Sequence, residues 1–136
     1  MGFHDLIIKC GIKYDSKECL QYIDNLMGFF KIESDTASRN LGLEKGVFSD
    51  FINSIYCDNL RLEYEKRKYE FNINDVFTYN FPCKEIEEVF NKNCYRNVAR
   101  TCIAPTGSLH ILAGGCSSGI EPIYLNEYER KSDTIN

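Results

Sequence analysis

RNVARTCIAPTGSLHILAGGCSSGIEPIY, residues 96–124, is the stretch of the sequence that decides the fold. Residues 95–104 are rich in side chains that favour β-structure, which predicts a strand. The turn PTGS follows, and LHILAGG then predicts a short helix. Residues 120–124 resume an apolar and aromatic run that predicts a second strand. The expected order is therefore strand, turn, helix and strand.

The PTGS turn has the chemistry of an anion site. Pro105 stiffens its entry, and Gly107 lets the backbone approach a ligand closely. The hydroxyls of Thr106 and Ser108 add donors beside the amides of Ser108 and Leu109. Charge-assisted hydrogen bonds contribute about 1.5–3 kcal/mol each, against about 0.3–1 kcal/mol for a helix dipole, so the amides would dominate. Spacing alone leaves open a plain turn in which Ser108 caps the next helix.

The first third of the chain, residues 1–46, predicts a helical segment. Residues 2–10 form a short helix closed by Gly11, because glycine tolerates the left-handed conformation that follows a helix end. Asp15 and Glu18 have the spacing of a capping box at the start of a long helix that ends at Gly46. One face of that helix is apolar and is expected to pack against a sheet or another helix, through Leu20, Ile23, Met27, Phe30, Ala37 and Leu41.

The middle of the chain carries weaker signals. VFSDFINSIY, residues 47–56, fits a short helix or an irregular packed stretch. Residues 56–80 are rich in charge and tyrosine, and we interpret them as a peripheral insertion that is either helix or hairpin. Pro82 fits the first turn of the helix CKEIEEVFNK, which opens a last part, residues 82–124, of helix, strand, phosphate loop, helix and strand.

Composition excludes several classes of function. The net charge of -4 argues against non-specific binding to nucleic acid or to anionic membranes. No apolar stretch approaches the ~18 residues of a membrane span, and the first residues lack the pattern of a signal peptide, so we expect a cytoplasmic protein. The seven cysteines are odd in number and include no CxxC pair, which favours reduced thiols and argues against a zinc site.

Three stretches resemble the catalytic subunit of ribonucleotide reductases. Residues 96–124 resemble the segment RNxxxTxIAPTGxxxxxAGxSSGIEP near the C-terminal end of the barrel, most closely in the adenosylcobalamin-dependent class. MGFHDLIIKCGIKYDSKE is similar to that family's stretch beginning MGF, and ASRNLGLEKGVFSDF resembles the helix and turn that follow it. The resemblance implies that residues 1–136 are a helix-rich piece, with a few strands, of a ten-stranded α/β barrel. Such a barrel converts ribonucleotides to deoxyribonucleotides by radical chemistry.

The resemblance also assigns candidate site residues. The substrate phosphates would be bound by Pro105, Thr106, Gly107, Ser108 and Leu109. The strand before this loop and the segment after it would support it, through Arg96, Asn97, Gly119 and Glu121. His110 follows closely enough to approach a phosphate, although a partly solvated histidine is the alternative.

The resemblance places the radical chemistry elsewhere. The NPCGE-like motif and the redox-active cysteine pair of the family are absent, so we expect no catalytic residue and no metal ligand in this chain, and its cysteines to behave as small apolar side chains. The implied partners are adenosylcobalamin bound outside the chain, a ribonucleoside di- or triphosphate, a thioredoxin-like reductant and the rest of the barrel. We expect this chain alone to be inactive. A non-catalytic nucleotide-binding remnant and a truncated structural fragment are the alternatives.

Overall fold

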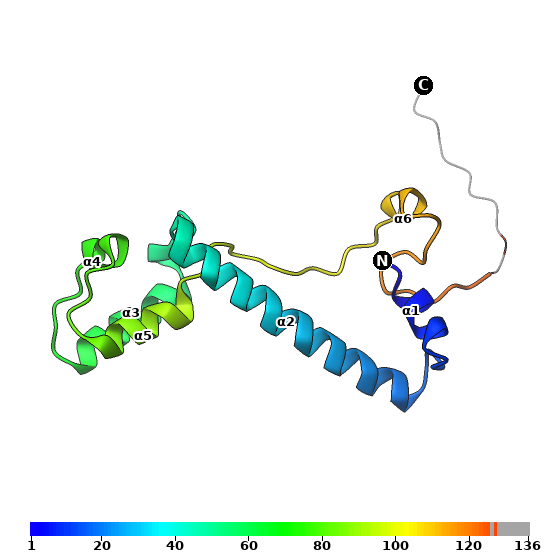
Figure 1. Ribbon diagram of the computed structural model, residues 1–136, viewed down its shortest axis with the longest axis horizontal. Coiled ribbons are helices and arrows are strands. Elements are labelled where there is room, and N and C mark those ends of the chain that lie inside the picture. Colours follow the sequence, from blue (N-terminus) through cyan, green and yellow to red (C-terminus); the bar gives the residue numbers. More distant parts are fainter. Residues whose placement is uncertain (126, 128–136) are drawn as a thin grey trace, which may run out of the picture. The chain divides into compact units, whose positions relative to one another are not determined.

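The computed structural model describes residues 1–125 and 127, which form two compact units. One unit holds Met1–Leu26 and the described residues from Cys102 onward, and the other is Met27–Thr101. The elements, in chain order, are α1 (Phe3–Lys9), α2 (Lys17–Lys45), the 3-10 turn η1 (Phe51–Asn53), α3 (Ile55–Lys66), α4 (Ile73–Thr78), α5 (Lys84–Asn93) and α6 (Leu109–Leu112) (Figure 1). None of the described helices has the length and apolar character needed to cross a membrane.

The expectation of an α/β fold is met only in its helical part. No strand occurs among residues 1–125 and 127, so the strands predicted at 95–104 and 120–124 are not formed. A strand is stable only when neighbouring strands satisfy its backbone hydrogen bonds. Here the backbone of residues 95–97 bonds to α2 and to the turn after it instead, which leaves an extended segment without a ladder.

The first unit is built around α1 and the start of α2. The predicted helix at 2–10 is confirmed, and Gly11 follows it with φ +69°. The predicted capping box of Asp15 and Glu18 is wrong. Ser16 caps α2, because its Oγ accepts from the Cys19 amide at 3.1 Å, while Asp15 pairs with Lys13. The core of this unit is small, with the buried side chains Phe3, Ile7 and Cys19.

Helix α2 has the predicted bounds but not the predicted packing. It ends at Lys45, and Gly46 follows with φ +84°. The apolar face was expected to pack against another element, yet Leu20, Met27 and Phe30 are 66%, 43% and 51% exposed. Periodicity identifies an amphipathic helix, but it does not supply the surface that would cover it.

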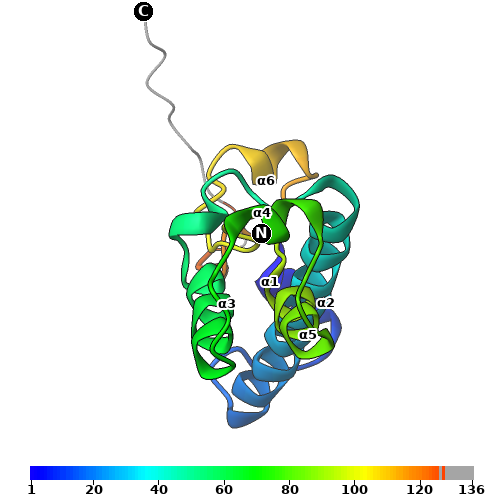
Figure 2. The same cartoon turned by 90° about the vertical axis from the view of Figure 1, so that its left-hand side faces the viewer.

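The second unit has the larger core. Helices α3 and α5 pack side by side (Figure 2). The helix start is encoded locally, since Ser54 caps α3 by accepting from the Cys57 amide. Pro82 lies just before the N-cap of α5, Cys83, rather than in its first turn. The buried side chains are Phe48, Phe51, Cys57, Leu60, Tyr64, Val76, Ile86, Phe90, Cys94 and Tyr95.

Residues 56–80 contain most of α3 and all of α4, and no strand, which decides for helix over hairpin. Their interpretation as an insertion in the family stays a prediction. Within this chain they supply core side chains, because Leu60, Tyr64 and Val76 are at most 1% exposed. Burial, together with the nearby Asp75 carboxylate, raises the pKa of Tyr64 to about 12.

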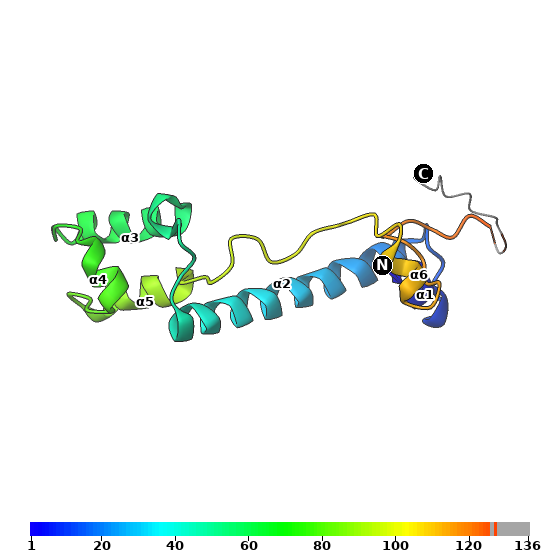
Figure 3. The ribbon, with the colours of Figure 1, turned by 90° about the horizontal axis from the view of Figure 1, so that it is seen from above.

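The extended segment 94–100 lies along α2 and α3 and is drawn in Figure 3 as a yellow trace that continues from α5. The Phe48 amide donates to the Tyr95 carbonyl at 3.2 Å. The Arg96 amide donates to the Ser38 carbonyl, and the Asn97 amide donates to the Ser38 Oγ, both at 3.0 Å. Gly42 permits this approach, because a Cβ there would collide with the Cys94 carbonyl. The segment is thus held by polar contacts to α2 instead of by a sheet.

Candidate functional site

The PTGS turn lies in the first unit and has an unusual backbone. Thr106 adopts φ +51°, a left-handed conformation that a threonine rarely takes. The His110 amide donates to the Thr106 carbonyl at 3.1 Å and leads into α6. Ser108 occupies the N-cap position, but its side chain makes no capping hydrogen bond. The alternative in which Ser108 caps the helix with its hydroxyl is therefore not observed.

The surface of this turn is open to a ligand. Pro105, Ser108 and Leu109 are exposed, and Thr106 and Gly107 are half-buried. Helix α6 has only four residues. Its dipole is correspondingly small, so any attraction for an anion must come from individual amides and hydroxyls.

The return segment, residues 116–123, contacts the turn through Gly119. The Gly119 amide donates to the Thr106 Oγ1 at 2.8 Å. Gly119 has φ +49°, and a Cβ on it would collide with the Glu121 carboxylate and lie 3.3 Å from the Ala104 carbonyl oxygen. The structure therefore brings one predicted supporting residue, Gly119, to the turn, and it places the carboxylate of another, Glu121, beside Gly119.

Residues at the start of α1 hold the return segment by hydrogen bonds. The sequence analysis did not predict these contacts. The Gly2 amide donates to the Ser117 carbonyl at 2.7 Å, and the His4 amide donates to the Ser117 Oγ at 3.2 Å. In the other direction, the Ser117 amide donates to the Asp5 Oδ2 and the Ile123 amide donates to the His4 Nδ1, both at 2.6 Å. The hydrogen bonds from Ser117 hold the pKa of the Asp5 carboxyl below its ordinary value.

His110 is held inside the turn. Its side chain is buried, and its Nδ1 lies 3.0 Å from the Thr106 carbonyl oxygen. This contact favours a structural role for the imidazole over contact with a ligand.

Arg96 and Asn97 belong to the other unit, Met27–Thr101, whereas the turn belongs to the first unit. The contacts described for these two residues are those within their own unit. The Arg96 Nη1 donates to the carbonyl of Lys45, the last residue of α2, and to the carbonyls of Gly46 and Val47 just after it, at 3.3–3.5 Å. The last carbonyls of a helix have no partner within it, so Arg96 acts as a cap of α2. Asn97 bonds to Ser38 through its amide and through its Oδ1.

The cysteines form no site among the described residues. All seven are free thiols. Burial raises the pKa of the Cys57 and Cys94 thiols, which makes them poor nucleophiles. The expectation that all seven are packed as small apolar side chains is wrong for Cys10 and Cys102, which are exposed. The part of the chain that the structure describes contains no cluster of histidine, cysteine, aspartate or glutamate that could hold a metal ion.

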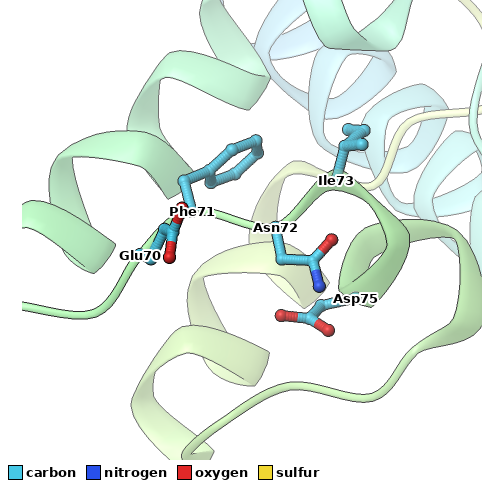
Figure 4. Close-up of a pocket in the computed structure, with 5 residues that line it drawn as sticks. All are labelled: Glu70, Phe71, Asn72, Ile73 and Asp75. Carbon is cyan, nitrogen blue, oxygen red and sulfur yellow. The ribbon is translucent and has the colours of Figure 1, made fainter.

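A surface hollow in the second unit is lined by Glu70, Phe71, Asn72, Ile73 and Asp75 (Figure 4). Phe71 and Ile73 point to one side of the chain, while Glu70 and Asn72 point to the other. Two carboxylates line this hollow and no cation does, so it disfavours a phosphate. It does not compete with the PTGS turn as a nucleotide site.

Comparison with known proteins identifies the family to which the segment around the turn is similar. The family model described as "Ribonucleotide reductase, barrel domain" matches residues 1–135. The chain is 35% identical over 130 residues to the "Vitamin B12-dependent ribonucleoside-diphosphate reductase" of Thermoplasma acidophilum, which covers 96% of this chain and 13% of that protein. It is 32% identical over 130 residues to the "Ribonucleoside-diphosphate reductase subunit alpha" of Helicobacter pylori, which covers 94% of this chain and 16% of that protein. No solved structure matches significantly.

A second vitamin B12-dependent relative, from Mycobacterium tuberculosis, is 27% identical over 96% of this chain and 14% of its own length. The chain thus spans only a small part of each of these relatives, between 13% and 16% of their length. Within that span the match to the family model extends over almost every residue, the turn and the return segment included. The chain therefore belongs to the ribonucleotide reductase family and corresponds to part of its barrel domain.

Proposed function

We propose that this chain is part of the catalytic subunit of a ribonucleoside-diphosphate reductase and that its PTGS turn, together with Leu109 after it, binds the substrate phosphates through residues 105–109. The observation that carries the proposal is the conformation of Thr106. A non-glycine residue is held at φ +51°, its hydroxyl accepts from the Gly119 amide, and the exposed residues Ser108 and Leu109 lie beside it. This arrangement supports the proposal, because a phosphate needs several donors that converge on one point.

Ser108 provides a clean test, because it is exposed and its hydroxyl does not cap α6. We expect the folded chain to bind cytidine diphosphate, with shifts in the amide NMR signals of residues 106–109. Ser108→Ala should weaken binding about tenfold or more, since a hydrogen bond to a charged group contributes about 1.5–3 kcal/mol. The matched control is Ser49→Ala, which removes an exposed hydroxyl from the other unit.

Gly107→Val extends the test to the backbone, because a branched side chain would block close approach of the anion. Equal affinities for wild type, Ser108→Ala and Gly107→Val would contradict the assignment of the turn. A folded wild-type chain that does not bind cytidine diphosphate would contradict phosphate binding by this chain alone. Binding without any reductase activity when a second chain supplies the other parts of the barrel would favour the non-catalytic remnant.

The remaining chemistry is proposed to lie outside this chain. We propose adenosylcobalamin as the cofactor, which would supply the radical, because two of the relatives are named as vitamin B12-dependent. We propose that its contacts lie in other parts of the enzyme, since the described residues include no cluster of side chains that could hold a metal ion. We further propose a cytoplasmic reductase that takes electrons from a thioredoxin-type dithiol and supplies deoxyribonucleotides for DNA synthesis.

A reductase assay tests the proposal that the catalytic residues lie outside this chain. We expect no reduction of cytidine diphosphate by the purified chain with adenosylcobalamin and dithiothreitol. Measurable deoxycytidine diphosphate would contradict the expectation that the catalytic cysteines lie elsewhere.

A further inference from the structure

Hydrogen bonds from α1 and Tyr14 hold the return segment on both sides of Gly119, the residue that contacts the turn. Ser117, at one end of the segment, is held by Gly2, His4 and Asp5. Ile123, at the other end, is held by the His4 Nδ1, and between them the Tyr14 hydroxyl donates to the Ile120 carbonyl at 2.6 Å. Gly119 lies between these anchors. Its position is therefore fixed from both sides.

The hydrogen bond from Gly119 decides what the Thr106 hydroxyl can offer. A hydroxyl has one proton to donate and two lone pairs that accept. The Gly119 amide occupies one lone pair of Oγ1 at 2.8 Å. The hydroxyl proton is then left to be donated, and a phosphate oxygen can only accept.

We infer that His4 and Asp5 are positioning residues for the Thr106 hydroxyl: they hold the return segment so that Gly119 orients this hydroxyl as a donor to a phosphate oxygen. The inference rests on the proposed function, since it names two further residues that act on the same site. Neither residue needs to touch the ligand.

The His4 imidazole is itself held in place. The Tyr14 ring lies edge-on to it, with the ring centroids 5.1 Å apart.

Amide exchange measured by NMR on the full 136-residue chain tests the anchors directly. His4→Phe removes the acceptor, whereas His4→Asn keeps an acceptor at the same distance from the backbone. We expect His4→Phe to speed exchange at Ile123 and Gly119 and His4→Asn to restore protection. Ile8→Ala, an exposed position on the same helix, is the matched control.

Affinity for cytidine diphosphate tests the consequence at the turn. At about pH 7.5 we expect His4→Phe and Asp5→Ala to weaken binding about tenfold, and His4→Asn to bind as the wild type does. Unchanged affinity and unchanged exchange at Gly119 in both weakened variants would overturn the inference. If His4→Phe loses the fold, Asp5→Ala, which removes the acceptor of the Ser117 amide, still decides. A wild type that does not bind cytidine diphosphate counts against the proposed function, whereas unaltered exchange at Gly119 counts against the anchors.

Discussion

Arg100 places a largely buried guanidinium group in the second unit. Its guanidinium pairs with the Asp35 carboxylate, donates to the Tyr56 hydroxyl at 3.3 Å and lies 4.2 Å from the centre of the Tyr95 ring. The side chains of Arg100 and Asp35 are only 17% and 13% exposed. Burial alone would raise the pKa of Asp35, but its hydrogen bonds to Lys31 and Arg100 outweigh burial and lower it. This single side chain joins the extended segment to both α2 and α3.

Asp35 has two cationic partners, which allows a controlled comparison. We expect Arg100→Ala to lower the free energy of unfolding by about 3 kcal/mol, because it leaves a nearly buried carboxylate without its main partner. Lys31→Ala should cost less than about 1 kcal/mol, since the lysine contacts the same carboxylate from a side chain that is 75% exposed. Urea unfolding followed by circular dichroism measures both values. Equal losses would contradict the importance given to burial.

At the scale of the element, α2 carries two glycines in different surroundings. A Cβ on Gly42 would collide with the Cys94 carbonyl and lie 3.2 Å from the Arg96 amide nitrogen, whereas a Cβ on Gly28 would meet nothing within 4 Å. Gly42 is therefore needed for the docking of the segment 94–100, and Gly28 is not.

We expect Gly28→Ala to stabilise the chain by about 1 kcal/mol, because alanine favours the helix, and Gly42→Ala to destabilise it despite the same gain in propensity. Thermal unfolding of the two variants gives the signs. A Gly42→Ala variant as stable as Gly28→Ala would show that the segment does not depend on this close approach.

The helices illustrate what the sequence could predict. The ends of α1 and α2 follow from Gly11 and Gly46, since a left-handed residue after a helix is a local property. The strands at 95–104 and 120–124 could not be predicted in the same way, because a strand depends on neighbours that are distant in sequence. For the same reason the apolar face of α2 predicted packing that this chain does not provide at Leu20, Met27 and Phe30.

In the candidate site too, residues close together in the sequence could be predicted, and contacts between distant residues could not. Thr106 and Ser108 were identified because the turn chemistry and the family motif lie within a few consecutive residues. Asp5 and His4 were missed, since their partners Ser117 and Ile123 lie 112 and 119 residues further along the chain. The Ser16 cap was missed because Asp15 offers an equally acceptable capping side chain one residue earlier.

At the scale of the whole molecule, the two units have cores of unequal size. The first buries Phe3, Ile7 and Cys19, whereas the second buries a much larger set of side chains around α3 and α5. Because buried apolar area is the main source of stability, the two units should open with different free energies.

Hydrogen exchange measured by mass spectrometry tests this difference. We expect amides in α3 and α5 to exchange at least about tenfold more slowly than those in α1, with α6 the fastest of the helices. Addition of cytidine diphosphate should slow exchange in the first unit more than in the second, since only the first contains the turn. Uniform exchange across both units would contradict independent opening.

The left-handed conformation of Thr106 sets the cost of keeping its hydroxyl. A non-glycine residue with positive φ costs about 1–2 kcal/mol, which glycine at this position would avoid. Glycine would also remove the hydroxyl that accepts from the Gly119 amide. Under the proposed function, Thr106→Gly should therefore weaken phosphate binding even where it does not lower the free energy of unfolding.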